Sequence, residues 1–158
     1  HASDAGFYAD RYPSARVLVP ASVRGKLFEK LPRIDGSIDD DWPEALRGEL
    51  AVVPLRGTRI GEVAFVHGPS RTLVLTDAVF NYRGDDLPRL SRLFMRANRA
   101  YDRFGPSRIF TSFVVSDRAA FSASIDALLA HEFDRVIMSH GRTLATGGKT
   151  AIRDAFGE

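Results

Sequence analysis

Hydrophobic and polar positions along the chain alternate between the period of a strand and the period of a helix, which predicts an α/β fold. Short apolar runs with the length and β-branched content of buried strands lie at 16–19, 49–55, 62–66, 72–76 and 136–138. Amphipathic stretches with helical spacing lie at 4–12, 21–30, 87–103, 117–131 and 150–156. The Gly-Pro pair in 67–70 predicts a β-hairpin, and the aspartate-rich stretch 35–41 predicts an exposed loop.

Composition changes this picture little. The chain has 158 residues, 44% of them hydrophobic and 27% charged, which is typical of one globular domain covering 1–158. The net charge of +2 does not require a nucleic acid or an anionic membrane as partner. The absence of cysteine excludes disulfides and thiolate sites and fits a reducing compartment. We therefore expect a cytoplasmic protein without a membrane partner, although removal of a leader before His1 remains an open alternative.

Two strands are followed by a side chain that could carry chemistry. Asp77 ends the segment TLVLTD, and His140 ends the segment RVIMSH. In α/β folds, ligands gather at the carboxyl ends of strands, and a carboxylate with an imidazole suits zinc, iron or manganese. The structural alternative is that Asp77 caps a turn and that His140 is a hydrogen-bonded histidine before a glycine turn.

These segments carry a resemblance to a known family. TLVLTDAVF resembles the strand-then-aspartate motif of the metallo-β-lactamase superfamily, and RVIMSHG resembles its closing strand with a terminal ligand histidine. Their order across most of 48–158 is similar to an uncharacterised bacterial family allied to that superfamily. The resemblance implies an αββα sandwich that is truncated or reduced at its N-terminus. A sheet face left uncovered would favour association with the missing N-terminal segment or with a second copy.

The resemblance also implies a set of ligands. Asp77 matches an aspartate that bridges two metal ions, and His140 matches a ligand of one of them. At the start of the chain, His1 would occupy one histidine of the His-x-His-x-Asp-His motif, Asp4 would replace its last histidine, and Ser3 its aspartate. The loop 55–59 lacks the further histidine that the superfamily carries before the hairpin. The expected metal ligands are thus His1, Asp4, Asp77 and His140, for one ion of zinc, or of iron or manganese; a chain without metal stays an alternative.

The implied function is metal-dependent hydrolysis of a small-molecule substrate of unassigned identity, an ester, amide, thioester or phosphoester. Asp77 would act catalytically, because it could orient a metal-bound water or accept its proton. A catalytically inactive relative of the superfamily is the first alternative.

A second alternative lies in the predicted helix 87–103. Five arginines recur there at spacings of three and four, within an arc of about 80°: Arg89, Arg92, Arg96, Arg99 and Arg103. Leucine, phenylalanine and alanine side chains occupy the other side, which we expect to be buried. Such a ridge could bind phosphates, a nucleic-acid backbone or an acidic partner, or be simply solvated. A nucleic acid is disfavoured, because no aromatic residue interleaves the arginines to stack on bases.

Overall fold

The computed structural model describes residues 4–84 and 86–157. The chain divides into two compact units, His1–Gly48 and Glu49–Glu158. The first of the candidate ligands, His1, lies outside the described residues. Within the described ranges, no helix has both the length and the apolar character that a membrane span requires.

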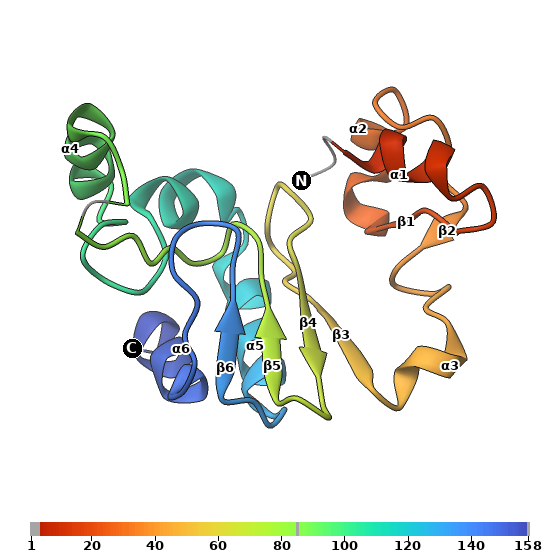
Figure 1. The fold of residues 1–158 in the computed structure, drawn as a ribbon. Helices are drawn as coiled ribbons and strands as arrows, with labels where there is room; N and C mark the ends of the chain where they lie inside the picture. Colours follow the sequence, from red (N-terminus) through yellow and green to blue (C-terminus); the bar gives the residue numbers. More distant parts are fainter. Residues whose placement is uncertain (1–3, 85, 158) are drawn as a thin grey trace. The chain divides into compact units, whose positions relative to one another are not determined.

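The first unit is built from short elements (Figure 1). They are α1 (Ala5–Arg11), β1 (Leu18–Val19), a 3-10 turn at Ala21–Val23, α2 (Arg24–Leu27), β2 (Gly36–Ser37) and α3 (Glu44–Arg47). The predicted helix at 21–30 is therefore shorter and begins as a 3-10 turn. The strands β1 and β2 pair in parallel.

The predicted exposed loop at 35–41 is wrong in part, because it contains β2 and a buried Ile38. Its aspartates are exposed, and two of them also accept hydrogen bonds from backbone amides. The Asp35 carboxylate accepts from the Val17 amide at 2.7 Å, and that of Asp39 accepts from the Ala21 amide at 2.9 Å. These bonds hold the segment 35–41 alongside β1. Its aspartates therefore have a structural role that the polar composition alone did not indicate.

The second unit contains a four-stranded mixed sheet. Its strands are β3 (Leu50–Pro54), β4 (Val63–His67), β5 (Thr72–Val74) and β6 (Arg135–Ile137), in that spatial order. The predicted hairpin is confirmed, since β4 and β5 pair antiparallel with His67 opposite Thr72. The strands β5 and β6 pair in parallel, which joins segments far apart in the sequence. The helices are α4 (Arg89–Ala97), a π-helical turn at Phe110–Val114, α5 (Arg118–Leu129) and α6 (Gly148–Phe156).

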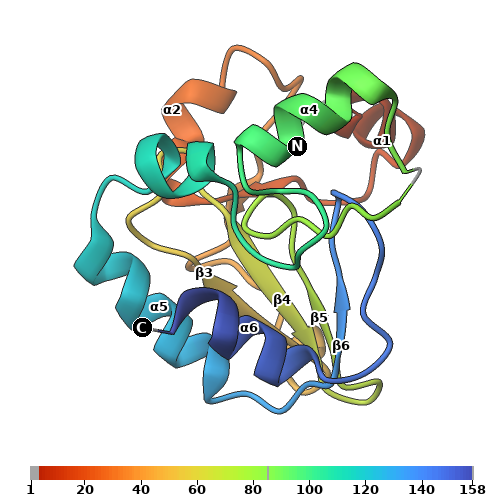
Figure 2. The ribbon, with the colours of Figure 1, turned by 90° about the vertical axis from the view of Figure 1, so that its left-hand side faces the viewer.

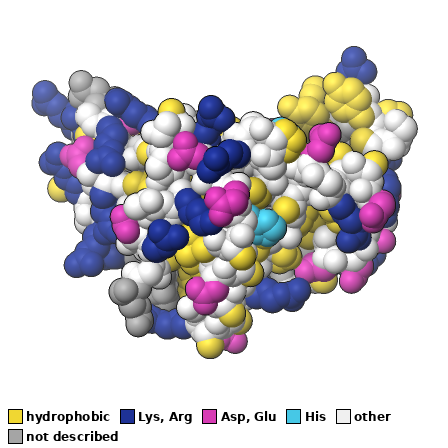
Figure 3. Space-filling view, turned by 90° about the horizontal axis from the view of Figure 1, so that it is seen from below, with side chains coloured by type: hydrophobic (Ala, Val, Ile, Leu, Met, Phe, Trp, Pro, Cys, Tyr) yellow, Lys and Arg dark blue, Asp and Glu magenta, His cyan; other side chains and the backbone are white. Residues whose placement is uncertain are grey.

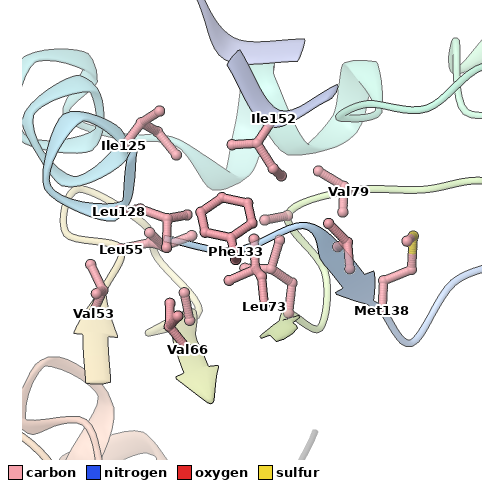
Figure 4. Close-up of a cluster of buried hydrophobic side chains, with 14 of the residues drawn as sticks. Val53, Leu55, Val66, Leu73, Val79, Ile125, Leu128, Phe133, Met138 and Ile152 are labelled. Carbon is pink, nitrogen blue, oxygen red and sulfur yellow. The ribbon is translucent and has the colours of Figure 1, made fainter. Parts of the chain in front are cut away.

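One face of this sheet is covered by helices (Figure 2). The helix α5 lies against β3 and α6 lies against β6. Between the layers, the fully buried Phe133 ring sits among Leu128 and Ile152 from the helices and Leu73 from the sheet (Figure 4). This cluster fixes the sheet whose strand ends carry the candidate site.

The opposite face of the sheet carries an apolar row. The side chains of Val52, Phe65, Val74 and Ile137 lie in register across the four strands, and none of them is buried.

The mixed sheet with helices on one face confirms the predicted α/β class. The two-sheet sandwich that the resemblance implies stays a prediction.

The predicted helix at 87–103 is wrong at its C-terminal end. The helix α4 ends at Ala97, and both Arg99 and Asp102 adopt left-handed backbone with φ of 55° and 57°. The cause is a competing backbone pairing, because Tyr82 pairs with Tyr101 and its carbonyl accepts from the Asp102 amide at 2.8 Å. This pairing brings Ala100 and Tyr101 into the buried core of the unit.

The expected burial of the apolar side of this helix is also wrong. The side chain of Leu90 is 84% exposed and that of Phe94 is 58% exposed. The half-buried residues of α4 are Ser91, Arg92 and Met95, which lie on another side of the helix. The apolar stripe of α4 therefore faces away from the core.

Candidate functional site

The candidate site lies where β5 and β6 end. The register pairs Val74 with Ile137, and Asp77 and His140 each follow three residues after those positions. Because parallel strands end at the same edge of a sheet, the two side chains emerge together. The His140 Nε2 atom lies 2.7 Å from the Asp77 Oδ1 atom. The expected proximity of this acid and this imidazole is confirmed, whereas their role as metal ligands stays a prediction.

Aromatic rings orient the imidazole. The Phe80 ring stacks on His140 with centroids 4.7 Å apart and planes 5° apart. The Tyr82 hydroxyl lies 3.5 Å from His140 Nδ1, so the two ring nitrogens face different polar groups. The side chains of His140 and Asp77 are 25% and 28% exposed. The pair is thus held in a defined orientation and remains accessible from solvent.

A buried acid that the sequence did not single out positions Asp77. Glu62 is 4% exposed and directly precedes β4. Its Oε1 atom accepts from the Thr76 amide at 2.8 Å and from the Asp77 amide at 3.1 Å. Its Oε2 atom accepts from the Thr76 hydroxyl at 2.5 Å. The only signal in the sequence is a glutamate at the start of an apolar strand, where a charge needs internal partners.

The segment that follows His140 is fixed by Asn81. The Asn81 amide donates to the His140 carbonyl at 2.9 Å, and the Asn81 side chain donates to the Arg142 carbonyl at 2.7 Å. Gly141 lies between them with a φ of 103°. A Cβ atom at this glycine would lie 2.4 Å from the Asn81 carbonyl carbon. Glycine is therefore required for the loop of His140 to approach the loop of Asp77 this closely.

An ion pair ties the same loop to the segment before α4. The Arg142 guanidinium donates to Asp86 Oδ1 from Nη2 at 2.8 Å and from Nε at 3.0 Å. This hydrogen bond, together with a bond from the Arg83 amide, lowers the pKa of the Asp86 carboxyl below its ordinary value. Asp86 in turn raises the pKa of the Arg142 guanidinium. Both groups thus stay charged at neutral pH.

The fit of a metal ion rests on two donors. Two ligands of a tetrahedral zinc ion lie about 3.3 Å apart, given bond lengths of about 2.0–2.1 Å. The pair at 2.7 Å would therefore separate by about half an ångström to admit the ion. Among the residues that the structure describes, no group of three or more His, Asp or Glu side chains is arranged to hold a metal. Asp4 is an exposed residue of the other unit, directly before α1.

Another histidine near the sheet has a structural partner. The Nδ1 atom of His67 lies 2.6 Å from the Ser70 hydroxyl, within the β4–β5 hairpin. Such a contact stabilises the turn, as expected of a turn histidine.

The structure separates the five arginines. Arg89, Arg92 and Arg96 belong to α4, whereas Arg99 and Arg103 follow its end. The Arg96 guanidinium lies 3.5 Å from Asp102 and 5.0 Å above the Tyr101 ring. The prediction of one continuous ridge along a single helix is therefore wrong. On the face of the molecule in Figure 3, basic and acidic side chains lie interspersed.

In sequence comparisons, no protein-family model and no curated protein matches the chain.

Proposed function

We propose that this chain carries a metal-dependent hydrolase site at Asp77 and His140. The observation that supports the proposal is the 2.7 Å contact between an imidazole and a carboxylate at the carboxyl ends of two parallel strands. The two groups are only partly buried, so a substrate can reach them. The substrate class of this proposal is a small ester, amide, thioester or phosphoester.

Each side chain has a distinct task in this proposal. A divalent ion of zinc, iron or manganese held by His140 Nε2 and Asp77 Oδ1 would polarise the substrate's carbonyl or phosphoryl oxygen and lower the pKa of a coordinated water. Asp77 would accept the proton of the attacking water. The Tyr82 hydroxyl and the stacked Phe80 ring hold the imidazole in one orientation, as the surroundings of a ligand histidine do.

The alternative of an inactive relative makes a different prediction from the same contact. A pair that serves structure alone keeps its hydrogen bond, binds no ion and hydrolyses nothing. Removal of His140 would then lower the free energy of unfolding without changing any metal content. Metal analysis therefore separates the two functions more directly than activity alone.

The experiment compares the metal content of the purified protein with that of two variants. We expect about one equivalent of zinc, iron or manganese per chain, which His140→Ala loses. His131→Ala is the matched control, because it removes an imidazole from the C-terminal end of α5 instead. Hydrolysis of p-nitrophenyl acetate and of bis-p-nitrophenyl phosphate provides the second measurement. A metal-free protein that binds no added zinc, or equal metal in both variants, would contradict the proposal.

A further inference from the structure

An apolar hollow lies beside the candidate site, at α4. It has a volume of about 430 Å³ and is lined by Tyr82, Leu87, Leu90, Ser91, Phe94 and Met95. Apart from the Ser91 side chain and the Tyr82 hydroxyl, the side chains of this lining are apolar. The hollow can therefore bind an apolar group by removing it from water, and it has few hydrogen-bond partners for a strongly polar group.

The hollow and the surroundings of the Asp77–His140 pair have Tyr82 in common. Tyr82 contributes to the lining of the hollow, and its hydroxyl lies 3.5 Å from His140 Nδ1. The Phe80 ring lies 6.4 Å from the Tyr82 ring and stacks on His140. A molecule with its reactive bond at the pair could thus extend an apolar chain past Tyr82 to α4.

The exposed apolar side chains of α4 are explained by such an occupant. Leu90 is 84% exposed and Phe94 is 58% exposed, although the helix has half-buried positions elsewhere. An aliphatic chain along this side of α4 would cover both side chains. Met95 has a flexible side chain that adapts to a chain of variable shape.

We propose that the substrate of this site is a carboxylic ester or thioester of a medium-length, unbranched aliphatic acid, whose acyl chain occupies the hollow at α4. The position of the reactive bond rests on the proposed function. In the reaction, the water oxygen bonds to the acyl carbon and the C–O or C–S bond breaks. One water proton goes to the departing oxygen or sulfur, so the products are a fatty acid and an alcohol or thiol.

The first test measures chain-length preference. The ratio of kcat/KM for p-nitrophenyl decanoate to that for p-nitrophenyl acetate is determined for the wild type and for Phe94→Ser. We expect the ratio to fall about tenfold or more in Phe94→Ser, since a lost apolar contact discriminates by about that factor. Phe113→Ser is the matched control, because Phe113 is 73% exposed and lies outside the lining of the hollow. An unchanged ratio in Phe94→Ser, or an equal fall in both variants, overturns the inference.

The second test separates this inference from the proposed function. Binding of decanoate is measured by calorimetry with the wild type, with His140→Ala and with His140→Ala/Phe94→Ser. Decanoate that binds His140→Ala/Phe94→Ser about tenfold more weakly than His140→Ala supports the acyl chain in the hollow, even if no ester is hydrolysed. Hydrolysis of the acetate ester without any binding of decanoate overturns the inference and leaves the proposed function standing.

Discussion

Replacement of Glu62 by alanine tests the account of how Asp77 is positioned. The carboxylate accepts three hydrogen bonds, two from the backbone amides of Thr76 and Asp77 and one from the Thr76 hydroxyl. Alanine removes all three acceptors. Glutamine keeps one carbonyl oxygen in place for the two amides and loses the charge. The two variants therefore separate the loss of hydrogen bonds from the loss of charge.

The magnitude follows from the number of donors left without a partner. A sheltered amide that loses its acceptor costs about 1–3 kcal/mol, and two such amides lie here. Both residues are half-buried, so water reaches them in part, and the Thr76 hydroxyl can turn to another acceptor. We therefore expect Glu62→Ala to lower the free energy of unfolding by about 2–4 kcal/mol and Glu62→Gln by about 1 kcal/mol. The larger value is a substantial part of the stability of a small domain.

Urea unfolding followed by far-ultraviolet circular dichroism measures these free energies, and amide hydrogen exchange locates the effect. The Thr76 and Asp77 amides should lose protection in Glu62→Ala and keep most of it in Glu62→Gln. Glu132→Ala is the matched control, since that carboxylate is exposed and its removal should leave the free energy of unfolding almost unchanged. A loss below about 1 kcal/mol in Glu62→Ala, with both amides still protected, would refute the reasoning.

Two further substitutions test the loops around the pair. Gly141→Ala should destabilise by about 2–4 kcal/mol in urea unfolding, because its Cβ atom would meet the Asn81 backbone. Gly147→Ala is the control, with a φ of 72° but no atom within 4 Å, and should cost about 1 kcal/mol; equal costs would contradict the close approach of the loops. Asp86→Asn should lower stability at neutral pH, because the hydrogen bond from Arg142 holds the pKa of folded Asp86 below its ordinary value. The difference in free energy of unfolding between this variant and the wild type should be complete above the ordinary pKa of an aspartate and vanish as pH falls through the lowered pKa. A difference that persists in more acidic solution would exclude the Arg142 ion pair as its cause.

The sequence predicted those features that depend on local pattern. The strands β4 and β5 and their hairpin follow from apolar runs separated by a Gly-Pro turn. The proximity of Asp77 and His140 follows from their places after two strands, because parallel strand ends meet at one edge. Periodicity and strand-end position were sufficient for this part of the site.

The features that the sequence did not predict depend on distant partners. The end of α4 at Ala97 is set by the pairing of Tyr82 with Tyr101, which no helical pattern reveals. Glu62 looked like an ordinary polar residue before a strand, and its role appears only once the Thr76–Asp77 turn is folded over it. The exposure of Leu90 contradicted the amphipathic pattern, since such a pattern identifies an apolar side but not what covers it.

The parallel pairing of β5 with β6 determines when the candidate site can form during synthesis of the chain. Asp77 and His140 are 63 positions apart, so their encounter waits for closure of a long chain segment and for the last strand to be made. A chain interrupted before residue 135 would contain Asp77 without His140 and would leave β5 as an unprotected edge, open to non-native partners. In the full chain, a change in the chemical shift of the His140 ring would report that His140 has reached Asp77 and that β6 has paired with β5.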